Sequence, residues 1–164
     1  MDWKDKIQVK KGNFGEKIIN DYLEKKGFIV YVPITEKAHA FDRLAVKDKK
    51  IFIIAEIKTK AKLNYYNATG FDIKHYKEYK LLSVKYNIPV FVFFIDEMIG
   101  KIYGNWLNEL EKQIEDDLNY PDFTKIKGVV LFSLSTMKTI AELTQEQIEK
   151  LKEYSSRNYN YNES

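Results

Sequence analysis

An apolar run ends in two charged side chains, a carboxylate at Glu56 and an amine at Lys58. The run, residues 51–58, is rich in β-branched residues and predicts a strand, in which residues two apart point to the same face. Glu56 and Lys58 should therefore stand side by side, with Ile57 facing the other way. Burying charge there costs roughly several kcal/mol unless a partner or a metal ion compensates. The pair is therefore a candidate for chemistry.

Two further acids lie where they could join this pair. Asp42 opens the preceding predicted strand, and a tight turn at residues 47–50 would bring it close to Glu56. Glu16 lies in a predicted helix, at the edge of its apolar stripe. Gathered carboxylates repel one another unless a cation lies between them, and hard oxygen ligands select Mg²⁺ or Mn²⁺. A nearby lysine could orient or activate water, or stabilise charge on phosphorus.

Hydrophobic periodicity and turn signals predict the elements that position these residues. Helices are expected from about Phe14 to the stop at Gly27, over 71–86, from Trp106 onward, and after a capping box at residues 144–147. Strands are expected at 28–34, 41–46, 51–60, 90–95, 101–103 and 128–134, and a loop at 63–70. The order α-β-β-β-α-β-β-α-β-α predicts an α/β fold in which a central mixed sheet is flanked by helices.

Composition narrows the class of protein. The 164 residues, 45% of them hydrophobic, suit a single domain, expected over residues 1–154 with a flexible tail at 155–164. The absence of cysteine excludes disulfides and thiolate metal sites. No apolar run approaches the roughly 20 residues that span a bilayer, and no signal-peptide core is evident, so a cytoplasmic protein is expected. The net charge of +3 does not by itself indicate a nucleic-acid partner.

Three short motifs carry a resemblance to a known family. Gly15-Glu16, Phe41-Asp42 and Glu56-Ile57-Lys58, followed by a helix and a strand, resemble the PD-(D/E)xK nuclease superfamily. The likeness covers roughly residues 12–96 and leaves 97–154 as a C-terminal extension. In spacing it is most similar to archaeal Holliday-junction resolvases and to phage or mobile-element nucleases. The resemblance implies a restriction-endonuclease-like fold and a metal-dependent endonuclease that hydrolyses DNA phosphodiester bonds.

The resemblance also implies a role for each matching residue. Asp42 and Glu56 would be ligands of Mg²⁺ or Mn²⁺, together with the carbonyl of Ile57, and Lys58 would be the catalytic lysine. Glu16 would bind a second metal or orient a water on the first. The chain departs from the family pattern at Phe41, which stands where the family usually has proline.

A basic and aromatic stretch follows these residues. Lys60, Lys62 and Tyr65 could hold phosphates and stack on bases, and Lys74 on the next predicted helix could extend that face. A solvated loop is an equally good interpretation. DNA is the partner that the resemblance implies. A homodimer is compatible with it, because cutting two strands needs two sites.

Simpler interpretations of single residues stay open. Glu56 and Lys58 could form an ion pair on a solvated edge strand, worth about 0–1 kcal/mol. The apolar residues just upstream occupy both faces of the strand and favour a central position instead. Glu16 could be a first-turn glutamate in favourable contact with the helix dipole. Asp42 could cap a turn or pair with Arg43.

The chain as a whole also has alternative interpretations. It could keep the nuclease fold as a non-catalytic module that binds nucleic acid or protein. A third interpretation is a structural accessory protein whose aromatic surface serves assembly. His75, on the apolar stripe of a predicted helix, is expected to pack rather than to catalyse.

Overall fold

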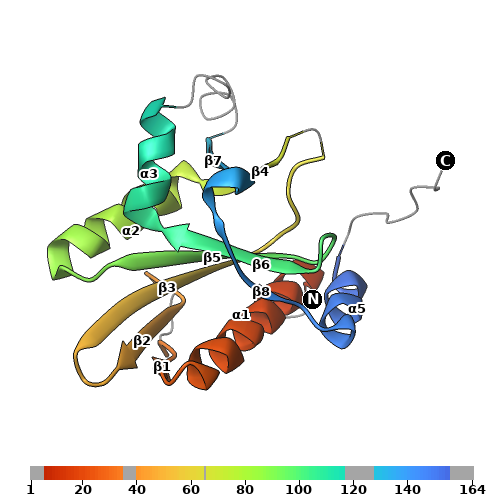
Figure 1. The fold of residues 1–164 in the computed structure, drawn as a ribbon, viewed down its shortest axis with the longest axis horizontal. Coiled ribbons are helices and arrows are strands. Elements are labelled where there is room, and N and C mark those ends of the chain that lie inside the picture. Colours follow the sequence, from red (N-terminus) through yellow and green to blue (C-terminus); the bar gives the residue numbers. More distant parts are fainter. Residues whose placement is uncertain (1–5, 35–39, 65, 117–127, 156–164) are drawn as a thin grey trace.

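The computed structural model describes residues 6–34, 40–64, 66–116 and 128–155 (Figure 1). Within these ranges the α-helices are α1 (Ile7–Lys25), α2 (Ile73–Tyr86), α3 (Leu107–Asp116) and α5 (Gln145–Glu153). The strands are β1 (Ile29–Tyr31), β2 (Arg43–Lys47), β3 (Ile51–Thr59), β4 (Ala68–Asp72), β5 (Val90–Asp96), β6 (Lys101–Trp106), β7 (Val129–Ser133) and β8 (Lys138–Glu142). A 3-10 turn, η2 (Leu134–Thr136), follows β7.

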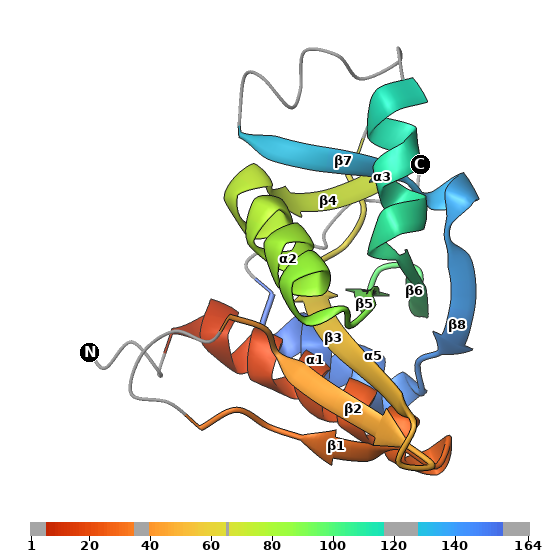
Figure 2. The same cartoon turned by 90° about the vertical axis from the view of Figure 1, so that its left-hand side faces the viewer.

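The larger sheet is the layer on which the fold is built. Its six described strands run in the order β1-β2-β3-β5-β6-β8. The pair β3–β5 is parallel, and the other neighbouring pairs are antiparallel. Helices α1 and α5 lie against one face, and α2 and α3 lie against the other (Figures 1 and 2). The predicted α/β fold, a mixed central sheet flanked by helices, is therefore confirmed.

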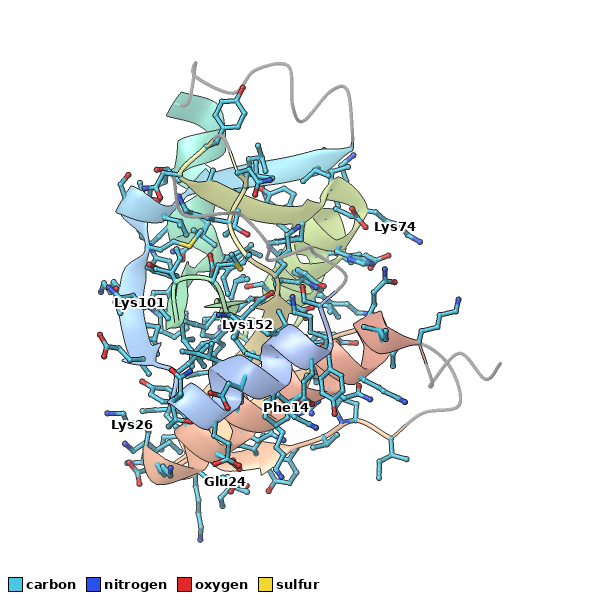
Figure 3. The ribbon with its side chains drawn as sticks, turned by 90° about the vertical axis from the view of Figure 1, so that its right-hand side faces the viewer. Phe14, Glu24, Lys26, Lys74, Lys101 and Lys152 are labelled. Carbon is cyan, nitrogen blue, oxygen red and sulfur yellow. The ribbon has the colours of Figure 1, made fainter. Side chains whose placement is uncertain are left out.

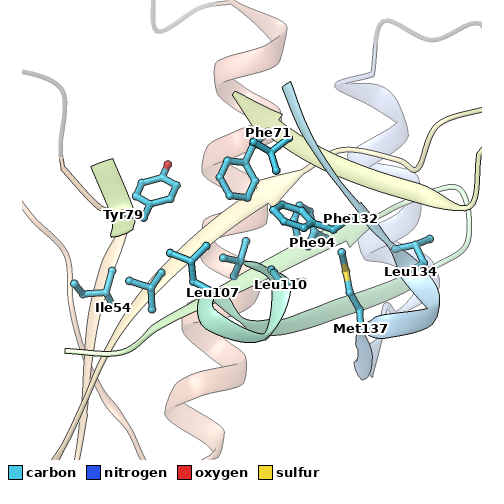
Figure 4. Close-up of a cluster of buried hydrophobic side chains, with 12 residues drawn as sticks. Ile54, Phe71, Tyr79, Phe94, Leu107, Leu110, Phe132, Leu134 and Met137 are labelled. Atoms are coloured by element: carbon cyan, nitrogen blue, oxygen red, sulfur yellow. The ribbon is translucent and has the colours of Figure 1, made fainter. Parts of the chain in front are cut away.

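The alternation of side chains along β3 divides the apolar core into two. Ile54 packs in the core beneath α2 and α3, whereas Ala55 and Ile57 pack in the core beneath α1 and α5. Because successive side chains of a strand point to opposite faces, Glu56 and Lys58 share the α2 face with Ile54. Figure 4 shows the α2-side core, in which the ring of Tyr79 lies at one end of the cluster. The charged pair thus lies where α2 can contact it.

The pairing of β4 with β7 is a long-range feature that the sequence does not predict. The expected loop at residues 63–70 and the expected helix start at Phe71 are both wrong, because β4 begins at Ala68 and α2 begins at Ile73. A strand partner so far along the chain leaves no mark on local periodicity. Gly70 is required at this pairing, because a Cβ there would overlap the carbonyl oxygen of Val130.

Other boundaries differ from the prediction for local reasons. β8 pairs with β6 at one edge of the larger sheet, and its mostly exposed side chains show no apolar pattern that would predict it. Trp106 ends β6 and is not the first residue of a helix. β1 is only three residues long. Helix α1 begins at Ile7, seven residues before Phe14.

None of the described helices is both long and apolar enough to cross a membrane. Of the expected tail at residues 155–164, only Ser155 belongs to the described part of the chain.

Candidate active site

Glu56 and Lys58 form a close ion pair near the carboxyl end of β3. The Nζ atom of Lys58 donates a hydrogen bond to Oε1 of Glu56 at 2.6 Å. Glu56 is only 2% exposed, and β3 lies between β2 and β5 in the sheet. The interpretation as a solvated pair on an edge strand is therefore wrong. The sequence places a charged pair inside the protein, at the face that α2 covers.

Asp42 lies just before β2 and reaches the backbone of β3. Its Oδ2 atom accepts a hydrogen bond from the N–H of Ile57 at 2.7 Å. Ile54 and Lys60 donate their N–H groups to carbonyls on the β5 side. Since backbone N–H and C=O groups of a strand alternate between its two neighbours, both groups of Ile57 point to the β2 side. The Ile57 carbonyl therefore lies on the same side of β3 as Asp42.

Tyr79 of α2 completes this cluster, a role that the local sequence pattern does not indicate. Its hydroxyl donates to Glu56 Oε1 at 2.5 Å and accepts from Lys58 Nζ at 2.9 Å. The ammonium of Lys58 also lies 5.3 Å from the centroid of the Tyr79 ring and 5.5 Å from that of Phe71. These distances suit cation–π attraction. Periodicity predicts that Tyr79 is apolar core, but it carries no signal for the partner of its hydroxyl.

Burial controls the protonation of this cluster. Burial first, and the charge of Asp42 second, raise the pKa of Glu56 to about 7, while Lys58 acts in the opposite direction. Burial and the neighbouring Glu56 raise the pKa of Tyr79, so the phenol stays protonated and able to donate. The second carboxylate oxygen, Glu56 Oε2, is buried without a hydrogen-bond partner among the described atoms.

The cluster opens into a pocket of about 590 Å³ between the start of β2 and helix α2. Asp42, Glu56, Lys58, Lys74 and His75 are among its lining residues. The side chain of Lys74 is 82% exposed and points outward from α2 (Figure 3). Of the lysines expected to contact DNA, Lys74 is the one that lines this pocket. His75, which was expected only to pack, lines it as well.

The remaining candidates for DNA contact lie beyond the end of β3. The backbone N–H of Lys60 donates to the carbonyl of Ile95, and that of Lys62 donates to the buried carboxylate of Asp96. These bonds fix the start of the loop at the carboxyl ends of β3 and β5. Neither lysine lines the pocket, and Tyr65 lies outside the described residues.

Glu16 is connected to the site through Arg43. The Nη2 atom of Arg43 donates to Glu16 Oε2 at 2.7 Å, and its Nη1 atom donates to the backbone carbonyl of Asp42 at 2.6 Å. Helix α1 approaches β3 closely at Gly15, where a Cβ would overlap the hydroxyl of Thr59. Glu16 does not line the pocket. The structure thus connects Glu16 to the cation beside Asp42.

The oxygen atoms of the site fit a hard divalent cation. Among the described residues, no group of three or more His, Cys, Asp or Glu side chains gathers in one place. A cation here would therefore be held by the carboxylates of Asp42 and Glu56 and by the carbonyl of Ile57. All three offer oxygen, which suits Mg²⁺ or Mn²⁺. The buried Glu56 Oε2 without a partner is the observation that supports this fit.

The mixed sheet, its strand order and the helices on both of its faces form a restriction-endonuclease-like fold. A particular solved protein with a similar fold is Hjc, a Holliday junction resolvase from the archaeal hyperthermophile Archaeoglobus fulgidus. The likeness covers 76% of this chain and 90% of the resolvase, with a TM-score of 0.55 and 12% sequence identity. The fold that the sequence resemblance implies is therefore confirmed. Neither a protein-family model nor a curated protein matches the chain.

Proposed function

We propose that this protein is a Mg²⁺- or Mn²⁺-dependent endonuclease that hydrolyses DNA phosphodiester bonds. The observation that carries the proposal is Glu56, a buried carboxylate held on one oxygen by Lys58 and left without a partner on the other. Such a group is costly in the absence of a cation. Glu56 lines the same pocket as Asp42 and Lys58, which supports a site where a bound phosphodiester is hydrolysed.

Each residue of the pocket has a task in this proposal. Asp42, Glu56 and the Ile57 carbonyl hold the cation, which when bound stabilises charge on a phosphoryl oxygen and makes a water molecule more acidic. The ammonium of Lys58 stabilises the charge that develops as water attacks phosphorus in line with the leaving oxygen. Burial of Glu56 strengthens these electrostatic interactions, since little water screens them.

DNA is the substrate that the surroundings favour. Lys74 extends from α2 at the mouth of the pocket, and Lys60 and Lys62 follow β3 at the same end of the sheet. Lysine supplies a mobile point charge that suits phosphate contacts more than base-edge recognition. The similar fold of Hjc, whose name identifies it as a Holliday junction resolvase, supports a DNA substrate. Contact through Lys60, Lys62, Tyr65 and Lys74 is part of the proposal.

A second copy of the chain is the partner proposed for one apolar face. Cross-strand partners lie on the same face of a sheet, and Ile29 and Phe52 both pair with Val46. Tyr31 lies two residues from Ile29, and Tyr86 of α2 lines a hollow with Phe52. These four side chains are 44–61% exposed, and no described helix covers β1 and β2 on this side (Figure 2).

The size of this apolar face supports a dimer. With Leu81 of α2, which is 66% exposed, it exposes on the order of 500 Å², at the upper end of what monomers present. A standard interface buries roughly 800 Å² from each partner, so the face could supply most of its apolar part. Leu81 also lines the active-site pocket, so pairing through this face would place two sites near one interface.

The experiment that tests the proposed function is a Mn²⁺ titration by calorimetry, followed by cleavage assays. We expect the wild type to bind Mn²⁺ and the Asp42→Asn, Glu56→Gln double variant to lose that binding. The titration is repeated with DNA present, because phosphate oxygens can complete a metal site. Branched, duplex and single-stranded DNA are then tested for cleavage. Absence of metal binding and of cleavage would favour the non-catalytic binding module instead.

The dimer is tested separately by sedimentation equilibrium. We expect Phe52→Glu to shift the protein from dimer to monomer, because it places a charge within the apolar face. Val84→Glu is the matched control, since Val84 is 75% exposed on α2 but lines a hollow towards α3. A monomeric wild type would contradict the dimer and leave the proposal for the active site standing.

A further inference from the structure

Tyr79 holds the two charged groups of the active site at once. Its hydroxyl donates one hydrogen bond, to Glu56 Oε1 at 2.5 Å, and accepts one from Lys58 Nζ at 2.9 Å. Lys58 also donates to the same Oε1 atom at 2.6 Å. A phenol has one hydrogen to donate and lone pairs that accept, so both of its functions are used. The three groups form a closed triangle in which each pair is hydrogen-bonded.

The two carboxylate oxygens of Glu56 differ in their hydrogen bonding. Oε1 receives both donors, whereas Oε2 is buried with no hydrogen-bond partner among the described atoms. A carboxylate free to rotate about its last bond could exchange these oxygens. With two donors fixed on one side, exchange would break both hydrogen bonds, so the same oxygen stays available.

The ring of Tyr79 is itself held by the core. It packs against Phe71 of β4 with centroids 5.6 Å apart, and Phe71 packs against Phe132 of β7 at the same distance. Figure 4 shows these aromatic residues within the α2-side cluster. Tyr79 is 4% exposed. The hydroxyl therefore projects towards Glu56 from a ring that has little freedom to move.

We propose that Tyr79 is a positioning residue of this active site, whose hydroxyl fixes Glu56 and Lys58 and leaves Glu56 Oε2 as the oxygen that binds the divalent cation. The inference rests on the proposed function, because the cation is the ligand for which the oxygen is positioned. Removing a hydrogen-bond partner that orients a metal ligand commonly lowers metal affinity or activity about 10–100-fold.

Tyr79→Phe removes the hydroxyl and keeps the ring that packs on Phe71. The matched control is Tyr76→Phe, one turn earlier on α2. Tyr76 also donates from its hydroxyl to a carboxylate, Glu111 Oε1 at 2.7 Å, but that bond joins α2 to α3. Each variant therefore loses one phenol–carboxylate hydrogen bond from the same helix, and only one of the two bonds lies in the active site.

The measurements are Mn²⁺ affinity by calorimetry without DNA, kcat and KM for cleavage at saturating Mn²⁺, and the melting temperature. We expect Tyr79→Phe to weaken Mn²⁺ binding about 10–100-fold and to lower kcat with KM for DNA unchanged. Tyr76→Phe should match the wild type in both. Once Glu56→Gln has removed the cation ligand, adding Tyr79→Phe should lower Mn²⁺ affinity no further.

Three results would overturn the inference. First, Tyr79→Phe could have the same Mn²⁺ affinity and kcat as Tyr76→Phe. Metal binding by Glu56 Oε2 would then not depend on the hydrogen bond from Tyr79 to Oε1. Second, Tyr79→Phe could lower the melting temperature without changing Mn²⁺ affinity or kcat, and Tyr79 would then contribute to the stability of the core alone. A wild type that neither binds Mn²⁺ nor cleaves DNA would remove the proposed function itself, and this result differs from the first two because it appears before any variant is made.

Discussion

Arg43 joins Glu16 of α1 to the backbone carbonyl of Asp42, beside the active site, through hydrogen bonds of 2.7 and 2.6 Å. The guanidinium is buried, with an exposed fraction of 8%, and Glu16 is its carboxylate partner. A buried cation that loses its partner is destabilising. Glu16 is therefore required for stability whether or not it also coordinates a metal ion.

We expect Glu16→Gln to lower the free energy of unfolding by about 1–2 kcal/mol, because the amide can accept from Arg43 but carries no charge. Urea denaturation of the metal-free protein measures this effect. The Mn²⁺ affinity should stay within about threefold of the wild type. This change is much smaller than the roughly 10–100-fold loss that follows when a group that orients a metal ligand is removed. A loss as large as that of Glu56→Gln would show instead that Glu16 is a metal ligand.

Helix α1 depends on glycine at one position and tolerates alanine at another. We expect Gly15→Ala to destabilise the protein by about 1–3 kcal/mol, because its Cβ would overlap Thr59 and press on Ile95. Gly12→Ala is the control within the same helix, since nothing lies within 4 Å of its added Cβ. It should be stabilising by about 0.5–1 kcal/mol through helix propensity. Thermal and urea denaturation compare the two, and equal effects would contradict the close contact.

Lys58 should be needed for cleavage and not for folding. We expect Lys58→Ala to slow cleavage at least about 10²-fold, the usual effect of losing one donor to a developing charge. The fold should persist, because Lys58 favours the charged form of Glu56 and its removal lets that carboxyl become neutral. Circular dichroism checks the fold, and Lys112→Ala, at an exposed lysine of α3, is the control. Undiminished cleavage by Lys58→Ala would show that the mechanism is wrong.

The contact between α2 and α3 should give a measurable pH dependence of stability. The hydrogen bond from Lys80, and after it the one from Tyr76, lowers the pKa of Glu111. A carboxyl whose pKa is lower in the folded state stabilises the fold above its unfolded pKa of about 4.3, and this contribution is lost as the pH falls through the folded pKa. Glu111→Gln should therefore cost more stability at pH 7 than at pH 3.

Urea denaturation at the two pH values measures this difference. Glu109→Gln is the control, because the ion pair of Glu109 within the described part of the chain is with the exposed Lys112 of its own helix, and such pairs contribute little. An equal loss at both pH values for Glu111→Gln would show that its charge does not hold α2 to α3.

Local patterns predict the part of the site that lies on one strand. The shared face of Glu56 and Lys58 follows from the two-residue period of β3, and the central position of that strand follows from the apolar residues before it. The approach of Asp42 follows from the tight turn between β2 and β3. These are relationships between residues close in sequence, which is why the sequence alone can indicate them.

The contacts from other elements could not be predicted in this way. Tyr79 reaches Glu56 across 23 positions, and its periodicity predicts only that its ring is buried. Arg43 appears in the sequence beside Asp42, but its bond to Glu16 requires the fold that brings α1 against β2. The strand that carries Phe71 depends on a partner near the far end of the chain. Tertiary contacts override local preference in each case.

The β4–β7 pairing also determines when, during synthesis of the chain, the fold around the active site can be completed. Every residue proposed for the site precedes position 80, whereas Phe132 of β7, which packs on Phe71 beneath Tyr79, is synthesised much later. Chains grow from the N-terminus, and contacts between distant residues form slowly because a long loop must close first. A nascent chain that ends before β7 would carry all the proposed active-site residues and still lack Phe132, which holds the Phe71 ring on which Tyr79 packs. Activity should therefore appear only after β7 has left the ribosome.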